Sequence, residues 1–139
     1  MTKLVTISDE VRAALAERGP VVALETTLVA HGFPAPVGVE VGLESDEAVR
    51  SAGAVPATIG VLDGQVRVGL SADELVRFTP NARKAGPRDL AVCSVRGEPG
   101  ATTVGGFAVP ADVPVVIDAT QCGNVNMGTW SATNLRRDA

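Results

Sequence analysis

Two short apolar runs, separated by a segment of helical spacing, constrain the fold of this 139-residue chain more than any other feature. The runs cover residues 21–25 and 55–62, and each has the length of a buried strand. Between them, apolar residues recur at helical spacing over residues 37–52, and Gly53 is well placed to end that helix. Strand, helix and strand in this order are typical of an α/β protein with parallel strands.

The rest of the chain adds strands and one hairpin. The dipeptide Asp63-Gly64 strongly favours a two-residue turn that leads into a strand at residues 65–68. The apolar segment 90–95 is predicted to be a further strand, and residues 113–117 another. Together these elements predict an α/β fold with a mainly parallel sheet, flanking helices and one β-hairpin.

Capping signals predict two more helices. Ser8 suits the N-cap of a helix that ends before Gly19. Ser71 and Glu74 form an S-x-x-E capping box at the start of a short helix that Pro80 ends. These helices supply the layers that flank the predicted sheet.

Composition narrows the classes of function. With 45% hydrophobic and 20% charged residues the chain fits one globular domain, and no linker or internal repeat divides it. A formal net charge of -4, only 3% aromatic residues and the absence of Tyr disfavour nucleic acid as a partner. No stretch approaches membrane-spanning length. Cys93 and Cys122 lie far apart without a C-x-x-C pair, so a reduced, cytoplasmic protein is expected.

Glu25 is the candidate catalytic residue, because it is the single carboxylate that closes the first apolar run. An acid at a strand end of an α/β sheet usually faces a ligand crevice. Such a position suits a proton donor or a general base. The alternative is a structural carboxylate that caps a neighbouring helix or pairs with an Arg.

Other residues are weaker candidates. Lys84 lies in a predicted polar basic loop, residues 81–88, from which its ammonium group can reach a phosphate or carbonyl oxygen; a solvated surface lysine is the alternative. Residues 101–104 could begin a helix whose free N–H groups form an anion site, although no G-x-x-x-x-G-K-[ST] loop is present. His31 is the only histidine, which excludes a metal site of several imidazoles, and a lone histidine more often orders a loop.

Three segments together resemble a known family. Residues 21–34 (VVALETTLVAHGFP), 53–70 (GAVPATIGVLDGQVRVGL) and 84–104, with its RDL and GATTV motifs, occur in the order and spacing of the pseudouridine-5'-phosphate glycosidases, also called indigoidine synthase A-like proteins. The resemblance implies reversible cleavage of the C-glycosidic bond of pseudouridine 5'-phosphate to uracil and ribose 5-phosphate. It also implies a trimeric α/β enzyme with a divalent metal, typically manganese.

The resemblance assigns roles to three residues. Glu25 matches the family's proton donor, Lys84 matches a substrate-binding lysine that precedes R-D-L, and Val104 matches a substrate-contacting valine in G-A-T-T-V. The chain has Gly86-Pro87 where the family usually has Ser-Arg, which could reshape the loop around the lysine.

The family pattern stops after Val104. The family's metal-binding D-I-S-A-D segment and the nucleophilic lysine of its A-G-A-K segment have no match, and no lysine follows Lys84. We therefore expect residues 1–104 to be the N-terminal part of a truncated family fold and residues 105–139 to be a divergent tail. Neither metal ligands nor a nucleophile are assigned, because the later carboxylates lie in no matching context: Asp112, Asp118 and Asp138.

The sequence leaves two functions open. The first is a glycosidase that acts on a small sugar-phosphate substrate, with manganese and homo-oligomers expected from the family and the activity of this short chain undecided. The second is a non-catalytic module that binds a sugar phosphate or assembles with a longer homologue, a role that the retained Glu25 and Lys84 also fit. Neither function involves a nucleic acid or a membrane.

Overall fold

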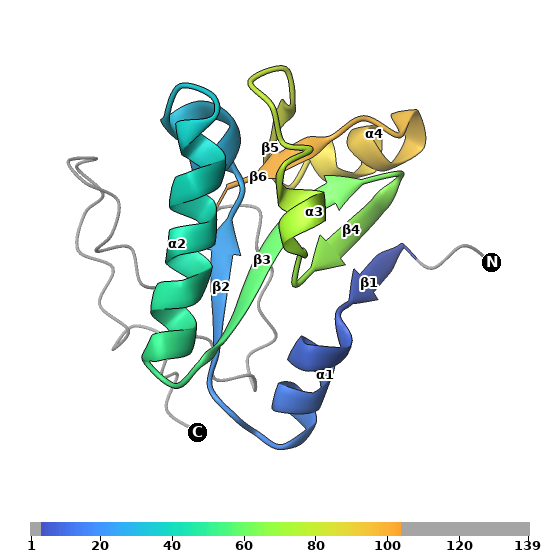
Figure 1. Ribbon diagram of the computed structural model, residues 1–139. Coiled ribbons are helices and arrows are strands. Elements are labelled where there is room, and N and C mark those ends of the chain that lie inside the picture. Colours follow the sequence, from blue (N-terminus) through green and yellow to red (C-terminus); the bar gives the residue numbers. More distant parts are fainter. Residues whose placement is uncertain (1–3, 104–139) are drawn as a thin grey trace, which may run out of the picture.

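The computed structural model describes residues 4–103, and Figure 1 shows the arrangement of their helices and strands. The elements in chain order are β1 (Val5–Ile7), α1 (Asp9–Ala16), β2 (Val21–Glu25), the π-helix η1 (Leu28–Gly32), α2 (Val37–Ser51), β3 (Val55–Leu62), β4 (Gln65–Val68), α3 (Ala72–Leu75), β5 (Arg83–Ala85), α4 (Asp89–Arg96) and β6 (Gly100–Thr102). Both apolar runs are therefore strands with the predicted limits, and the segment between them contains the predicted helix.

β3 is central to the sheet, because three other strands pair with it. β2 runs parallel to β3, with Val21 opposite Val55 and Glu25 opposite Ile59. β4 and β6 run antiparallel to β3, while β1 pairs with β4, and β5 with β6, in parallel. Three of the five pairings in residues 4–103 are thus parallel. The predicted α/β class, a mainly parallel sheet with flanking helices and one hairpin, is confirmed.

The hairpin between β3 and β4 turns at Asp63 and Gly64, as predicted. Both residues have positive φ, 52° and 76°, which is the conformation that a type I′ turn requires. The Arg77 guanidinium donates two hydrogen bonds to the Asp63 carboxylate, at 2.8 and 2.6 Å. These bonds hold the pKa of the Asp63 carboxyl below its usual range.

The predicted N-caps of α1 and α3 and the predicted stop of α2 are also present, whereas α3 ends at Leu75, before Pro80. The Ser8 hydroxyl accepts a hydrogen bond from the N–H of Val11 at 3.3 Å and so caps α1. Ser71 and Glu74 form the complete capping box of α3, with side chain and backbone bonded in both directions. Gly53 follows α2 with a φ of 84°, which satisfies the geometry of a helix C-terminus.

The segment 90–95 is helical, so the strand predicted there was wrong. It lies within α4, which has Asp89 in its first turn and ends at Gly97 with a φ of 66°. Cys93 is fully buried whereas Val95 is 88% exposed, which is the one-sided burial of a surface helix. The β-branched residues of the segment suggested a strand, but the signals at its two ends favour a helix. Burial raises the pKa of the Cys93 thiol, which keeps it protonated.

Three short strands were not predicted from the sequence. β1, β5 and β6 have three residues each, too few to show a pattern of their own. Residues 101 and 102, which could have begun a helix, instead belong to β6, where Gly100 lies opposite Val61 and Ala101 opposite Gly60. Pairing with β3 and β5 supplies hydrogen bonds that so short a segment cannot specify alone. The strand predicted at residues 113–117 lies outside the described residues.

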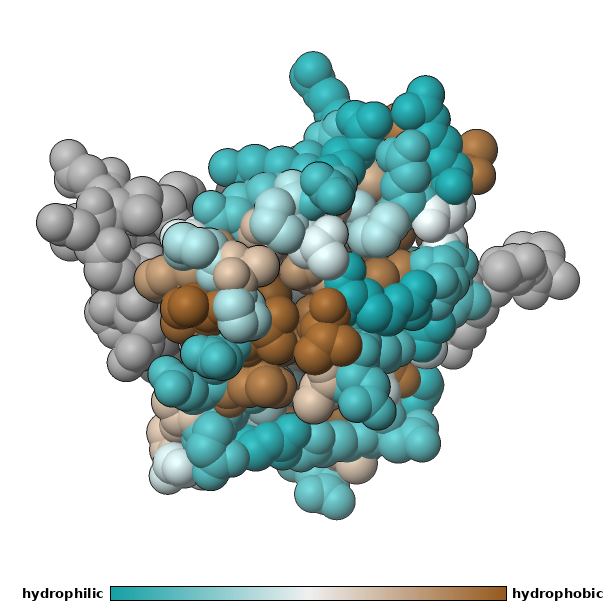
Figure 2. All heavy atoms as spheres, turned by 45° about the horizontal axis from the view of Figure 1, so that its top comes forward, coloured by the Kyte–Doolittle hydropathy of each residue, from teal (hydrophilic) through white to brown (hydrophobic). Residues whose placement is uncertain are grey.

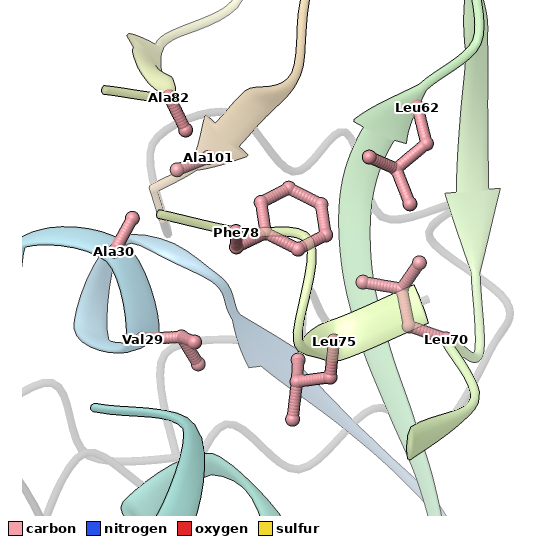
Figure 3. Packing of buried hydrophobic residues seen from close by; sticks show 8 residues of the cluster. All are labelled: Val29, Ala30, Leu62, Leu70, Leu75, Phe78, Ala82 and Ala101. Atoms are coloured by element: carbon pink, nitrogen blue, oxygen red, sulfur yellow. The ribbon is translucent and has the colours of Figure 1, made fainter. Parts of the chain in front are cut away.

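The largest apolar cluster fills the space between the sheet and the segments η1, α2 and α3. Gly60 of β3 leaves room for the Phe78 ring, because a Cβ at this position would overlap with it. Smaller clusters pack α1 against β2 and β3, and α4 against β3 and β5. Figure 3 shows the buried members of the largest cluster: Val29, Ala30, Leu62, Leu70, Leu75, Phe78, Ala82 and Ala101.

Some apolar side chains remain at the surface of the described part. Figure 2 shows apolar atoms gathered near the middle of one face, with hydrophilic surface around them. None of the helices in residues 4–103 is long and apolar enough to cross a membrane. The large apolar residues with exposed side chains are Leu4, Val5, Phe33, Val37, Leu43, Val76, Val92 and Val95.

Two glycines allow α2 to lie close against η1. A Cβ added to Gly38 would overlap with the carbonyl oxygen of Val29. A Cβ on Gly42 would lie 2.8 Å from a Val29 methyl and 2.9 Å from a Leu75 methyl. Both glycines are buried. The lack of a side chain at these two positions therefore sets how closely α2 approaches η1.

Asp46 on α2 carries a half-buried carboxylate that faces β3. It accepts a hydrogen bond from the Thr58 hydroxyl at 2.6 Å. Burial raises the pKa of Asp46, and the Thr58 bond and Arg50 oppose this only in part. A carboxyl whose pKa is raised by folding stabilises the fold below its unfolded pKa, and this contribution is lost as the pH rises through the folded value.

We therefore expect Asp46→Asn to be at least as stable as the wild type at pH 7. Asn keeps an oxygen that can accept from Thr58 and carries no charge to desolvate. Urea unfolding at pH 4 and pH 7 should show that the wild type loses more free energy of unfolding across this range than the variant does. Glu44→Gln, at an exposed position of α2, is the control. An equal pH dependence in wild type and Asp46→Asn would contradict the expectation.

Candidate active site

Glu25 lies at the carboxyl end of β2, where this strand meets the end of β6. β2 pairs with β3 as far as Ile59, and β6 pairs with the next two residues, Gly60 and Val61. At these positions β4 pairs with the opposite edge of β3. β2 and β6 therefore pair with the same edge of β3, one after the other, and run toward each other. Glu25 is half-buried. The predicted strand end is confirmed, and the role of Glu25 as a proton donor stays a prediction.

Two buried threonines join the ends of β2 and β6. Thr26 is 0% exposed and Thr102 is 1% exposed. The Thr26 hydroxyl donates to the Ile59 carbonyl at 2.8 Å and accepts from the Thr102 N–H at 2.8 Å. The Thr102 hydroxyl donates to the same Ile59 carbonyl. These groups satisfy one another, which makes a buried polar junction stable.

Two further side chains that follow Glu25 reach the same part of the sheet. The Thr27 hydroxyl donates to the Ala101 carbonyl of β6 at 3.2 Å. His31 Nε2 lies 2.9 Å from the carbonyl of Ala82, the residue before β5. Because a carbonyl only accepts, His31 carries a proton on Nε2 in this contact. His31 thus links the end of η1 to the start of β5, which is the loop-ordering role expected of it.

Lys84 is the middle residue of β5, an edge strand, so the loop predicted over residues 81–88 was wrong at residues 83–85. It lies opposite Ala101 of β6 and is exposed. Its neighbour Ala85 packs with Cys93 of α4, and the alternation of side chains along a strand places Lys84 on the other face. An exposed ammonium group here fits both the predicted contact with substrate and the alternative of a solvated surface lysine.

The carboxyl ends of three strands converge on this junction. β5 and β6 run opposite to β2, and Glu25 and Lys84 both lie within two residues of the ends of their strands. Glu25 lies opposite Ile59, which shares a face with Val61 and hence with Ala85. Lys84 faces the other way. A ligand can therefore contact both residues only by lying across the strand ends.

The third predicted site residue, Val104, lies outside the described residues, as does the segment 105–139. Thr103 just before it is half-buried, and its N–H donates to the Ala85 carbonyl at 3.3 Å. Because residues 101 and 102 belong to a strand, the anion site predicted at a helix start there was wrong. The Thr102 hydroxyl donates to the Ile59 carbonyl inside the sheet.

Metal ligands are not assembled in this part of the protein. Within residues 4–103, no group of three or more His, Cys, Asp or Glu side chains could hold a metal ion. Manganese takes several carboxylate, carbonyl or water oxygens, with imidazole as a further option. The described residues therefore do not fit manganese, which stays an expectation from the family resemblance. No chemical step is derived through it.

Sequence reasoning did not find the threonine junction. Thr26 and Thr102 are separated by 76 residues, and nothing in the sequence shows that they meet. The signal that could have identified them is the pair of threonines directly after the strand-end acid. Ser and Thr hydroxyls commonly satisfy backbone groups where a strand or helix ends.

Proteins similar in sequence to this chain include several that carry one name, pseudouridine-5'-phosphate glycosidase. The sequence profile described as "Indigoidine synthase A like protein" matches residues 10–129. A pseudouridine-5'-phosphate glycosidase of Rhodospirillum centenum is 43% identical over 141 aligned residues, which cover 99% of this chain and 44% of the relative. One of Streptomyces griseus is 54% identical over 104 residues, covering 73% of this chain and 32% of the relative.

Two solved structures have the same fold. The prealnumycin C-glycosynthase AlnA, in complex with ribulose 5-phosphate, superposes with a TM-score of 0.65 at 42% identity, covering 76% of this chain and 34% of that one. An indigoidine synthase A-like protein of Thermotoga maritima gives a TM-score of 0.65 at 28% identity, covering 82% and 38%. The chain spans less than half the length of these relatives. A profile match over most of its residues shows that the chain belongs to the indigoidine synthase A-like protein family.

Proposed function

We propose that this chain carries the proton-donating and phosphate-binding part of a pseudouridine-5'-phosphate glycosidase. The observation that carries the proposal is the convergence of β2, β5 and β6, which brings the strand ends with Glu25 and Lys84 to one junction. The names of the relatives support this substrate, and the related glycosynthase AlnA binds a pentose phosphate, ribulose 5-phosphate.

The two residues suit different parts of the reaction. When the bond between ribose C1' and uracil C5 breaks, C5 must gain a proton, and Glu25 is the proposed donor. Lys84 supplies an ammonium group that can bind the 5'-phosphate as a point charge. A substrate that lies across the strand ends would place its phosphate and its base on the two sides of the junction.

A second candidate function is sugar-phosphate binding without turnover. No lysine follows Lys84 within these 139 residues, so they do not include the nucleophilic amine that the family resemblance implies. Loss of a catalytic nucleophile commonly costs several powers of ten in rate while binding survives. The two functions therefore share one binding site and differ in turnover.

Two assays on the purified chain test the proposal. Uracil release from pseudouridine 5'-phosphate, with and without manganese, measures turnover, and calorimetric titration with ribose 5-phosphate measures binding. Turnover would establish the first function. Binding without turnover would establish the second, and the absence of both from a folded chain would overturn the proposal.

Replacing Lys84 by Ala is expected to weaken ribose 5-phosphate binding by about tenfold to a hundredfold, the range for loss of a hydrogen bond to a charged group. Arg77→Ala is the matched control, because it removes a positive charge from the hairpin, where Arg77 pairs with Asp63. Its affinity should stay within about twofold of the wild type. Unchanged binding by the Lys84 variant would identify Lys84 as a solvated surface residue.

A further inference from the structure

The segment that directly follows Glu25 is tied by side chains to the strands that carry Lys84. β2 and β6 meet end to end along β3 and have no ladder of their own. The link is made instead by hydroxyl and imidazole groups of Thr26, Thr27 and His31, which contact backbone groups of the segment 82–102. These contacts bridge the two halves of the candidate site.

Thr26 is the centre of this link. Its buried hydroxyl is bonded on both sides, to the Ile59 carbonyl and to the Thr102 N–H, each at 2.8 Å. The Ile59 carbonyl also accepts from the Thr102 hydroxyl, so one backbone oxygen holds the ends of both strands. A buried group that loses such a partner is costly, so the strand ends would have to shift to satisfy it.

We propose that Thr26 is a positioning residue that sets the carboxylate of Glu25 against the strands bearing Lys84. The inference rests on the proposed function, because it assigns these two residues to one ligand. The Thr26 hydroxyl does not touch the ligand in this role. It holds the end of β2 in a fixed position relative to the end of β6. Because β5 pairs with β6, it also fixes the position of β5.

The test compares three variants of the full chain. Thr26→Val keeps the shape of the side chain and removes its hydroxyl, whereas Thr26→Ser keeps the hydroxyl. Thr58→Val is the matched control, since Thr58 is also a buried strand threonine, 3% exposed, but its hydroxyl bonds to Asp46 of α2. The readouts are affinity for ribose 5-phosphate, uracil release, and amide NMR signals of β5 with hydrogen exchange at Thr102.

We expect Thr26→Val to lose about tenfold to a hundredfold in ribose 5-phosphate affinity or in turnover, the range for a misplaced reacting group. Thr26→Ser should restore the loss, and Thr58→Val should stay near the wild type after correction for the folded fraction. Thr26→Val should also shift the Lys84 amide signal and speed exchange at Thr102. Equal losses in the Thr26 and Thr58 valine variants would overturn the proposal, because both would then act only through stability.

The NMR readout separates this proposal from the proposed function. If the wild-type chain neither binds ribose 5-phosphate nor releases uracil, the proposed function fails. The positioning role of Thr26 is then tested from the NMR signals of the chain without ligand. A shift of the Lys84 signal in Thr26→Val but not in Thr58→Val supports positioning, whereas changes confined to β2 and Thr102 overturn it. If Thr26→Val fails to fold, His31→Ala is tested in its place. His31 is exposed, and this substitution removes its hydrogen bond to the Ala82 carbonyl.

Discussion

Replacing Glu25 by Gln is expected to slow uracil release by roughly 10²- to 10⁴-fold, while ribose 5-phosphate binding stays within a few fold of the wild type. Gln has nearly the same shape but no proton of carboxylic acidity to donate to the leaving uracil carbon. General acid catalysis contributes on the order of 10²- to 10⁴-fold, so a loss of this size is expected in the turnover rate. Steady-state uracil release and calorimetric titration of the same preparations provide the measurement.

The control for this substitution is Glu44→Gln. Glu44 lies exposed on α2 and loses the same charge when it is replaced. Its variant should match the wild type in both assays. An unchanged rate for Glu25→Gln would remove Glu25 from the mechanism and favour the alternative of a structural carboxylate.

Replacing Gly38 by Ala is expected to destabilise the fold by about 1–3 kcal/mol, the usual cost of overpacking. The added Cβ would overlap with the Val29 carbonyl oxygen of η1, which is backbone and cannot turn aside as a side chain could. The sign is informative, because Gly to Ala in an open helix interior stabilises by roughly 0.5–1 kcal/mol. Urea unfolding followed by circular dichroism measures the change.

Glu44→Ala, on the same helix but at an exposed position, should change the free energy of unfolding by less than about 0.5 kcal/mol. A Gly38→Ala variant more stable than the wild type would show that α2 and η1 can separate without cost. Because η1 begins two residues after Thr26, the same substitution should also perturb the amide signal of Thr102.

The sequence was most informative where local chemistry and the fold agree. The limits of β2 and β3 were predicted, because an apolar run bounded by turn residues leaves few alternatives. The hairpin at Asp63 and the capping box at Ser71 were predicted for the same reason. The position of Glu25 at the end of the first run marks it as a candidate independently of the family resemblance.

The remaining elements depend on partners distant in the sequence. The segment 90–95 has β-branched residues suited to a strand, yet it is helical, with Asp89 in the first turn and Gly97 at its end as helix signals. β5 and β6 exist only through pairing with each other and with β3. The bonds between Thr26 and Thr102 depend on that pairing, so no local pattern could predict them.

The pairing of β2 and β6 with one edge of β3 has a consequence for the order in which the protein folds. The pairings of β2 with β3 and of β3 with β4 close short or moderate loops, whereas Thr26 meets Thr102 across 76 residues. Contacts between distant residues carry the larger entropy of loop closure and tend to form late. During synthesis, the residues around Glu25 leave the ribosome long before the strand that completes their surroundings. The candidate site is thus among the last parts to be assembled, and partial unfolding from the β6 side would dismantle it before the β2–β3 pair opens.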